Sequence, residues 1–413
     1  MRILSGDAAA ERVRKIAARG THYASVEPAV RQIIADVRRN GDRAVRKYAE
    51  RWDRLPAGEA LRVSTEETRA AWGGVSADLK RSLRVAAANI RRFCEMQKPA
   101  EWIRKADGIS LGQLARPLDS VGCYVPGGRY PLVSTLLMTA IPALVAGVKR
   151  IVVTSPSPQK DVLAAAAMLG VHEVYRMGGA QAVAALAYGT KTIARVDKIV
   201  GPGNLYVTAA KKEVAFDCSI DFLAGPTEGM IVSDKGTPEF IAADLVAQAE
   251  HDPEAVAIFI TTREKMAWQV AESVTELSAG NAIAREALHR SGVILVAASR
   301  KQSFDWANEI ACEHLTIERA DLPLVKNAGS VFIGDYSAQA AGDYASGPNH
   351  VLPTGGVARF RGGLSVLDFV KVISVQNLSR TGLRQIAPAI ETLATAEGLQ
   401  AHAQSIRVRC GHA

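Results

Sequence analysis

Four short segments in the second half of the chain combine acids, amides and imidazoles at spacings that could do chemistry. They hold four of the eight histidines and read QAEH (248–251), CEHLTIE (312–318), GDYASGPNHVLPTGG (342–356) and AEGLQAH (396–402). Carboxylate and imidazole groups can be tuned toward neutral pH and then exchange protons with a substrate. Nitrogen and oxygen donors without sulfur also suit Zn²⁺ or another first-row divalent ion. The segments therefore predict acid–base chemistry, a metal site, or both.

The first segment closes a predicted helix. Thr237 can cap this helix and Pro238 suits its first turn, while Pro253 ends it, so His251 falls at its C-terminal end. Gln248 and His251 are three residues apart and therefore share one face. They could bind one metal ion, and a plain surface cap is the alternative interpretation.

The second and third segments place acids next to imidazoles. Glu313 and His314 stand just ahead of a strand-like run, where such a pair could act as general acid and base, and an exposed loop pair is the alternative. The segment with Asp343 and His350 has four glycines and two prolines, which predicts an irregular loop of the kind that often carries function. A turn-forming Asp and a buried His are the alternative there.

The fourth segment holds Glu397 and His402. A spacing of five residues puts two side chains about 140° apart on an ideal helix. Both can face one site only if the helix breaks, and we expect that break at Gly398.

The elements that must position these residues follow a clear order. The first hundred residues are predicted to be helical, as an amphipathic pair interrupted at Asn40-Gly41 and a longer pattern from Ser64 to about Gln97. From Ser120, short β-branched runs alternate with helical ones, and a second such series covers about 229–335. This alternation is typical of parallel sheets, so two α/β units are predicted, followed by a helical tail after Asp368.

Three glycine-bearing loops in the first α/β series could lie against a ligand. They read YVPGGRYP (124–131), MGGAQA (177–182) and VGPGNLY (200–206). Glycine lets the backbone approach a ligand closely, and helix N-termini beyond such loops favour phosphate. The nearest match to the dinucleotide fingerprint, Gly201-Pro202-Gly203-Asn204, lacks the third glycine, so the motif alone indicates a nucleotide only weakly.

Composition narrows the class of protein. With 413 residues, 48% hydrophobic and 22% charged, the chain should form two or three packed units. The net charge of +8 could indicate a nonenzymatic nucleic-acid or metal-binding protein, but the basic residues near the N-terminus alternate with acids, as on a solvated face. Five cysteines without CxxC spacing predict free thiols. Without a leader-like start or an apolar span, we expect a cytoplasmic protein that binds neither nucleic acid nor membrane.

Taken together, eight motifs in order resemble the histidinol dehydrogenase family from about residue 20 to the C-terminus. They are VGCYVPGGRYPLVSTLLMTAIPA, YRMGGAQAVAALAYGT, VDKIVGPGNLYVTAAKK, DFLAGPTE, AADLVAQAEH, CEHLTIE, GDYASGPNHVLPTGG and IETLATAEGLQAH. Eight ordered motifs over some 300 residues are far more specific than any one of them.

The resemblance implies a role for each candidate residue. The zinc ligands would be Gln248, His251, Asp343 and His402, and the catalytic acid–base pair would be Glu313 and His314. NAD would contact Tyr124, Gln181 and Asn204. The substrate would contact Thr227, His350 and Glu397, together with the four zinc ligands and His314.

The reaction that the resemblance implies takes L-histidinol through L-histidinaldehyde to L-histidine with two NAD. In it His314 would accept the alcohol proton, and Glu313 would deprotonate the water that attacks the aldehyde. One Zn²⁺ per subunit would chiefly orient the substrate. A paralogous zinc- and NAD-dependent enzyme acting on another small alcohol, such as a sulfonated diol, is the alternative.

The resemblance also implies an architecture, an α/β fold with two incomplete Rossmann-like parallel-sheet domains similar to the aldehyde-dehydrogenase-like fold. Residues 1–21 would form a helical N-terminal segment. Residues 22–123 and 228–365 would form the domain with most metal and catalytic residues, and 124–227 the domain that contacts NAD. A helical tail, 366–413, would exchange with the partner subunit of a homodimer, so that two chains share each active site.

Two residues depart from the family pattern. Thr227 stands where the family often has Ser, which keeps a hydroxyl but adds a methyl group. Cys312 stands where Pro is common and could act as a thiol nucleophile toward the aldehyde. We favour activated water over that thiol, because Glu313 already supplies the base.

Overall fold

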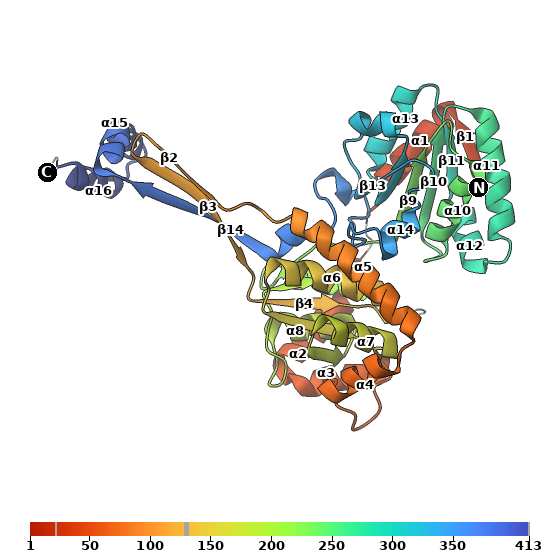
Figure 1. Ribbon diagram of the computed structural model, residues 1–413, viewed down its shortest axis with the longest axis horizontal. Helices are drawn as coiled ribbons and strands as arrows, with labels where there is room; N and C mark the ends of the chain where they lie inside the picture. Colours follow the sequence, from red (N-terminus) through yellow and green to blue (C-terminus); the bar gives the residue numbers. More distant parts are fainter. Residues whose placement is uncertain (21–22, 128–131, 412–413) are drawn as a thin grey trace.

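The computed structural model describes residues 1–20, 23–127 and 132–411. They form two α/β domains, each built on a parallel sheet, and a long arm that carries the C-terminus (Figure 1). The predicted fold class, with two parallel-sheet units, is confirmed. Residues 128–131, which belong to the first glycine-bearing loop, lie outside the described residues.

The first domain has a six-stranded parallel sheet whose strands lie in the order β1-β11-β10-β9-β12-β13. The strands are β1 (Arg2–Ser5), β9 (Glu228–Val232), β10 (Val256–Thr261), β11 (Val293–Val296), β12 (His314–Ile317) and β13 (Ser330–Ile333). Successive residues alternate between two cores: Met230 and Val232 face α1 (Gly6–Ala17) and α13 (Arg300–Ile310), while Ile231 faces the other way. The helices over that second face are α10 (Pro238–Ala249), α11 (Glu264–Ser278) and α12 (Ala282–Arg290).

The second domain has a five-stranded parallel sheet in the order β6-β5-β4-β7-β8. Its strands are β4 (Ser120–Tyr124), β5 (Arg150–Ser155), β6 (Glu173–Arg176), β7 (Lys198–Val200) and β8 (Ser219–Ile220). One face is covered by α2 (Glu27–Asn40), α3 (Asp42–Trp52), α8 (Gly179–Tyr188) and α9 (Leu205–Val214). The other is covered by α4 (Thr65–Gly74), α5 (Ala77–Met96), α6 (Val133–Ala146) and α7 (Lys160–Leu169).

Local signals explain how the early helices divide. Gly41 separates α2 from α3 with a φ of +54°, which confirms the predicted interruption at this glycine. The single pattern predicted from Ser64 to Gln97 is in fact two helices. Ser76 adopts an extended conformation and its hydroxyl accepts a hydrogen bond from the amide of Leu79, so it ends one helix and caps the next.

The predicted domain boundaries are wrong at two places. The helices between 27 and 96 do not join the domain that holds 228–365, because their apolar residues, such as Val30, Ile34 and Ile90, share cores with the 120–220 sheet. Residues 1–21 are not a separate helical segment, because β1 pairs with β11 as an edge strand of the first sheet. In both cases the position of the segment is set by contacts with residues far away in the sequence.

The arm is a three-stranded antiparallel sheet that ends in two helices (Figure 1). It consists of β2 (Trp102–Ala106), β3 (Ile109–Pro117), β14 (Val370–Leu378), α15 (Arg380–Ala396) and α16 (Gln400–Cys410). The prediction of a wholly helical tail after Asp368 is therefore wrong, because nine residues of β14 pair with β3. Ile103, Val372 and Ile373 remain exposed on this thin sheet.

The remaining elements are short. They are the helix α14 (Gln339–Tyr344) and three 3₁₀ turns, η1 (Arg319–Leu324), η2 (Val357–Arg359) and η3 (Val366–Phe369). None of the helices in the described part of the chain has the length and apolar character of a membrane span.

Candidate active site

The adjacent acid and base lie at the amino edge of the first sheet. His314 is the first residue of β12, as the predicted strand entrance requires, and it pairs in register with Gly229 of β9. Glu313 therefore lies beside Glu228, the residue that opens β9. Parallel α/β sheets usually bind ligands at their carboxyl edge, so this site uses the opposite edge of its sheet.

Glu313 is buried and firmly held. Its Oε2 accepts hydrogen bonds from the hydroxyl of Thr227 at 2.7 Å and from the amide of Glu228 at 2.9 Å. Only 7% of the residue is exposed. Because both bonds go to one oxygen, the other oxygen can face a reactant.

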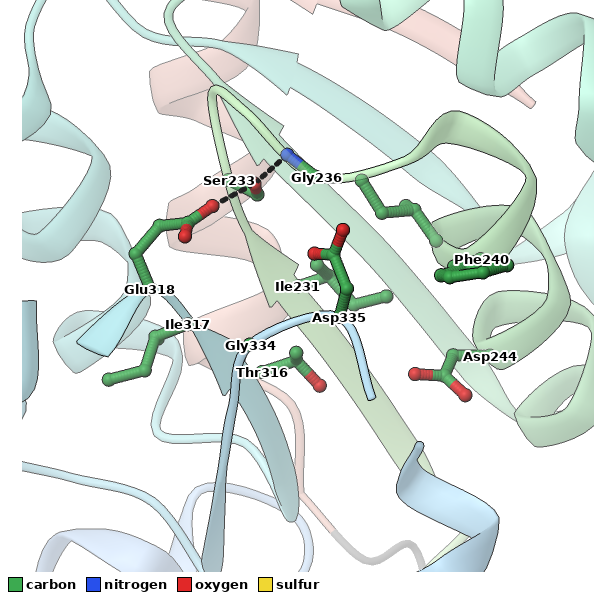
Figure 2. A pocket seen from close by; sticks show the side chains of 11 residues that line it. Ile231, Ser233, Gly236, Phe240, Asp244, Thr316, Ile317, Glu318, Gly334 and Asp335 are labelled. Atoms are coloured by element: carbon green, nitrogen blue, oxygen red, sulfur yellow. Dashed lines mark hydrogen bonds between the residues drawn. The ribbon is translucent and has the colours of Figure 1, made fainter. Parts of the chain in front are cut away.

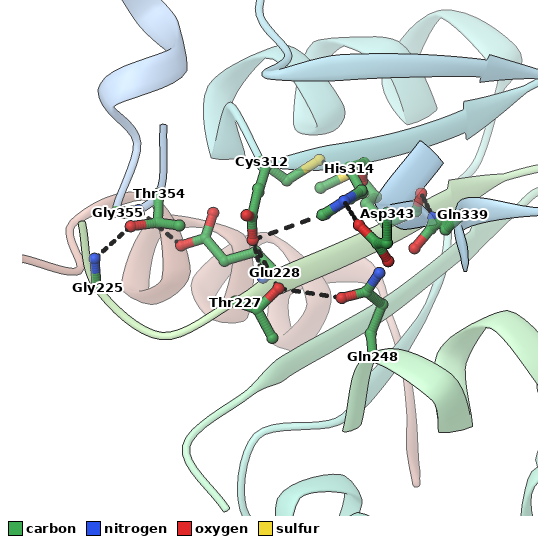
Figure 3. A network of polar contacts seen from close by, with 12 residues as sticks. Gly225, Thr227, Glu228, Gln248, Cys312, His314, Gln339, Asp343, Thr354 and Gly355 are labelled. Atoms are coloured by element: carbon green, nitrogen blue, oxygen red, sulfur yellow. Dashed lines mark hydrogen bonds and ion pairs between the residues drawn. The ribbon is translucent and has the colours of Figure 1, made fainter. Parts of the chain in front are cut away.

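His314 lies between the carboxylates of Glu313 and Asp343, and Figure 3 shows its ring beside Asp343. Its Nε2 is 3.2 Å from Oδ1 of Asp343, and its Nδ1 is 3.7 Å from Oε2 of Glu313. Its ring stacks on Phe332. Burial alone lowers the pKa of His314, but the charges of Glu313 and Asp343 outweigh burial and raise this pKa to about 10. Its protonation thus depends on the charge state of these two neighbours.

Asp343 and His350 connect the two domains. Asp343 lies on α14 and not in the predicted irregular loop, which begins after Tyr344. The Nδ1 of His350 is 2.7 Å from the backbone oxygen of Asp343, so Nδ1 carries the proton. Its Nε2 lies 3.5 Å from the hydroxyl of Thr135 on α6 of the second domain. Burial lowers the pKa of His350, which favours the neutral ring.

Gln248 and His251 lie at the C-terminal end of α10. Gln248 is buried in the last turn, and its Oε1 lies 3.0 Å from the hydroxyl of Thr227. His251 is exposed just beyond the helix. Burial raises the pKa of Asp343, but the hydrogen bond and charge of His314 outweigh burial and lower this pKa, with smaller contributions from His350 and from His251 nearby. Thr237 occupies the predicted N-cap position, but its hydroxyl donates to Asp335 at 3.1 Å and does not cap the helix.

The structure brings only three of the four predicted zinc ligands into one neighbourhood. Glu397 and His402 are exposed on the arm, on either side of a break at Gly398, whose φ is +75°. The predicted break is confirmed, but in Figure 1 the arm helices stand far from α10 and α14. Among the described residues, no group of three His, Cys, Asp or Glu side chains could hold a metal ion.

The three residues predicted to contact NAD surround the carboxyl edge of the second sheet. Tyr124 ends β4, and Asn204 caps α9 just after β7, its Oδ1 accepting from the amides of Tyr206 and Val207. Because β4 and β7 are neighbours from which the chain continues in opposite directions, this is the switch point where α/β sheets bind ligands. Gln181 lies in the first turn of α8.

Tyr124 and Gln181 are buried and hydrogen-bonded to the protein, although Oε1 of Gln181 has no hydrogen-bond partner among the described residues. The Tyr124 hydroxyl accepts from the amide of Gly179 at 3.0 Å. The side-chain amide of Gln181 donates to Oδ2 of Asp53 at 3.0 Å, and Asp53 also accepts from Gly178 at 2.8 Å. Burial raises the pKa of Asp53 to about 6, against the lowering effect of these two hydrogen bonds. Asn204, by contrast, is exposed at the carboxyl edge of the second sheet.

Sequence reasoning missed Arg19, Glu228 and Asp53. Arg19 binds the buried Glu228 with two bonds of 2.5 Å, and Glu228 also accepts from Gly355 at 2.8 Å. Burial raises the pKa of Glu228 although Arg19 opposes that shift. Glu228 could have been predicted, because it is the acid that ends the GPTE motif and begins a buried strand. No local pattern marks Arg19 or Asp53, whose partners are distant in sequence.

Cys312 is unsuited to act as a nucleophile. Its thiol is buried, and its Sγ lies 3.1 Å from the backbone oxygen of His314. Burial raises the pKa of this thiol well above its usual range, so the reactive thiolate is disfavoured. All five cysteines are free and buried, which confirms the prediction of free thiols.

A small cavity lies at the carboxyl edge of the first sheet (Figure 2). Its volume is about 20 Å³, which is room for one water molecule. Ser233 lies between Glu318 at 2.6 Å and the amide of Gly236 at 2.8 Å. None of the predicted site residues lines this cavity, so it is separate from the acid–base pair.

The described residues form an α/β protein of two parallel-sheet domains, one of which carries a buried carboxylate–imidazole pair. Comparison with known proteins identifies its family. The family model described as histidinol dehydrogenase matches residues 17–410. The chain belongs to the histidinol dehydrogenase family, which confirms the resemblance and the predicted class, an oxidoreductase of histidine biosynthesis.

Individual relatives agree over nearly the whole chain. The histidinol dehydrogenase of Methanothermobacter thermautotrophicus is 48% identical over 92% of each chain. That of Geobacillus kaustophilus is 49% identical over 92% of this chain and 93% of its own. The crystal structure of histidinol dehydrogenase from Elizabethkingia anophelis is 36% identical, with a TM-score of 0.94 over 99% of this chain and 98% of the other.

Proposed function

We propose that this chain oxidises L-histidinol through L-histidinaldehyde to L-histidine, with two molecules of NAD as hydride acceptors. The observation that carries the proposal is the buried pair of Glu313 and His314 beside the domain junction, together with membership of the family. The 120–220 sheet would bind NAD at its carboxyl edge, near Tyr124, Gln181 and Asn204. The site on the other domain would bind the substrate.

In the first half-reaction His314 would accept the proton of the substrate hydroxyl while hydride leaves the adjacent carbon for NAD. The products are the aldehyde, NADH and one proton. A base must be neutral to accept this proton, and the carboxylates of Glu313 and Asp343 oppose that state. A positive charge bound at Asp343 would therefore favour the basic form of His314.

In the second half-reaction Glu313 would deprotonate a water molecule that adds to the aldehyde carbon. The resulting hydrate gives up its hydride to a second NAD, releases two protons and becomes the carboxylate. The amide of Glu228 and the hydroxyl of Thr227 hold Glu313 in place for this step. His350 would contact the substrate from the loop after α14.

Zn²⁺ fits the donors that surround Asp343. Gln248 offers an amide oxygen, His251 an imidazole nitrogen and Asp343 a carboxylate, which are ligands that Zn²⁺ accepts. When bound, one zinc ion per subunit would orient the amino and imidazole nitrogens of the substrate. The fourth ligand, His402, would have to come from elsewhere, because α16, which carries it, lies on the arm away from α10 and α14 (Figure 1).

We propose that the fourth ligand comes from a second copy of the chain in a homodimer. The arm supports this, since a thin antiparallel sheet with exposed Ile103, Val372 and Ile373 is poorly stable unless another surface covers it. The partner's arm would carry Glu397 and His402 to the substrate and zinc. The five free thiols fit a reducing compartment, and we propose that the enzyme works in the cytoplasm.

The stoichiometry of the reaction tests this function. Purified protein is supplied with limiting L-histidinol and excess NAD, and NADH is counted with and without a chelator. We expect two NADH for each histidinol and loss of turnover in chelator. One NADH with accumulated aldehyde, or preferential oxidation of a sulfonated diol, would overturn the proposal.

A further inference from the structure

The turn after β7 is held by a buried ion pair at Gly201. The amide of Gly201 donates to Oδ2 of Asp221 at 2.8 Å, and Nζ of Lys211 donates to the backbone oxygen of Gly201 at 3.0 Å. Lys211 and Asp221 also bind each other. Their side chains are only 3% and 1% exposed. Two opposite charges thus bind both polar groups of one backbone residue.

Gly201 is a position where the backbone needs such support. Its φ is +111°, a conformation that side chains rarely adopt, and a Cβ atom there would lie 2.2 Å from the backbone oxygen of Tyr124. Only glycine fits, and glycine is the residue with the greatest conformational freedom. The turn over 201–204 begins here and ends at Asn204, which caps α9.

Stability alone does not account for a charged pair at this place. Removing two charges from water is costly, and apolar residues of similar volume are often as stable or more so. Lys211 comes from the last turn of α9 and Asp221 follows β8, so two separate elements converge on the turn. Asp221 also accepts from the amide of Phe222 at 2.7 Å, which fixes its own orientation.

We propose that Lys211 and Asp221 are positioning residues that hold the 201–204 turn in the conformation that accepts the dinucleotide. This inference rests on the proposed function, because it assumes that NAD binds beside Asn204 and Tyr124. The pair acts on the backbone of Gly201 and does not itself touch the cofactor. The turn is thereby preorganised, so that binding does not have to order a flexible glycine.

Two double variants of the full chain test the proposal. Lys211→Met with Asp221→Leu removes both bonds to Gly201, whereas Lys211→Met with Asp221→Asn keeps an acceptor for its amide. For the first variant we expect hydrogen exchange in the turn about tenfold faster and a KM for NAD about tenfold higher, with kcat and the KM for histidinol within about twofold. The second variant should lie between it and wild type.

A control away from the turn is the ion pair of Arg150 and Glu173 at the amino edge of the same sheet. They are joined by bonds of 2.8 and 2.9 Å and lie far along the strands from the turn. Arg150→Met with Glu173→Gln should leave the KM for NAD unchanged. An equal rise in this control would overturn the proposal, because it would show a general effect of removing ion pairs from the sheet.

The remaining outcomes separate the two proposals. Unchanged exchange in the turn, faster exchange with unchanged NAD affinity by calorimetry, or loss of folding in both double variants would each overturn the positioning role. Wild-type protein that binds NAD but does not oxidise histidinol would remove only the proposed function, and exchange and calorimetry would still decide the role of the pair. Wild-type protein that binds no NAD would overturn both.

Discussion

The hydroxyl of Thr227 lies 2.7 Å from Oε2 of Glu313 and also 3.0 Å from Oε1 of Gln248. A hydroxyl has one hydrogen, and the carboxylate of Glu313 is the stronger acceptor. In its contact with Gln248 the Thr227 oxygen can therefore only accept a hydrogen bond. It does so when the amide nitrogen of Gln248 faces Thr227. This orientation would turn the amide oxygen toward Asp343, where the proposed zinc ion would bind.

Removing the Thr227 hydroxyl should weaken catalysis. Thr227→Val deletes the donor to Glu313, and a hydrogen bond to a charged group is worth about 1.5 to 3 kcal/mol, so kcat/KM should fall roughly 10- to 100-fold. Thr227→Ser keeps the hydroxyl and serves as the matched control, with activity near wild type. Oxidation of histidinol by each variant is measured by NADH formation. A Val variant as active as the Ser variant would show that this bond does not matter.

Glu313→Gln should separate the two half-reactions. Glutamine has the same shape but cannot deprotonate water, so oxidation of supplied histidinaldehyde should fall by about 10²- to 10⁴-fold. The alcohol step should suffer far less, because it does not need an attacking water. Single-turnover NADH formation from each substrate measures both steps. Equal losses in the two would contradict the assignment of Glu313.

Cys312→Ser should retain most activity. The thiol is buried and its pKa is raised by burial, so it contributes no nucleophile to the proposed reaction. Steady-state kinetics with histidinol and with histidinaldehyde test this. A loss beyond about a hundredfold in the aldehyde step, in a variant that remains folded, would revive the thiol mechanism.

Metal removal should abolish activity reversibly. The donors near Asp343 are nitrogen and oxygen atoms, and His251 among them is exposed, so an ion held there can be extracted and reloaded. Dialysis against a chelator is expected to stop NADH formation, and added Zn²⁺ to restore it, with metal content followed by atomic absorption. Full activity in protein free of metal would exclude an essential zinc ion.

Mixed dimers should recover activity that neither parent has. His251→Ala and His402→Ala proteins, each inactive, are unfolded together and refolded. If each site draws His402 from the partner, a mixed dimer has one site with both lesions and one with neither, so about a quarter of wild-type activity should return. Mixed dimers that form but remain inactive would rule out the shared site.

Asp53→Asn should stabilise the protein in a pH-dependent way. Burial raises the pKa of Asp53 from 3.8 to about 6, so folding favours the protonated carboxyl. That contribution is present below pH 3.8 and is lost as pH rises through 6. Relative to wild type, the neutral variant should therefore gain at most about 3 kcal/mol between pH 4 and pH 8. Urea unfolding at both values measures this, and a difference independent of pH would contradict it.

The sequence by itself determined most of the elements and the order of the chemical motifs. Short β-branched runs and helical runs located most strands and helices of the two parallel sheets, because burial of apolar residues leaves a local pattern in the sequence. The edge strand β1 was not among them. The break at Gly398 was predictable from the 140° separation of Glu397 and His402. The strand entrance at His314 was readable from the β-branched run that follows it.

Only the tertiary structure decided how these elements meet. The apolar face of α2 does not by itself indicate which sheet it covers, and its place on the 120–220 sheet depends on partners more than a hundred residues away, such as Val152 and Tyr175. The β14 strand forms because β3 pairs with it, whereas the sequence pattern of the same residues, taken alone, predicts a helix. The site lies at the amino edge of one sheet, and the arm holds His402 away from Asp343, because long-range packing places each motif and no local pattern records its distant neighbour.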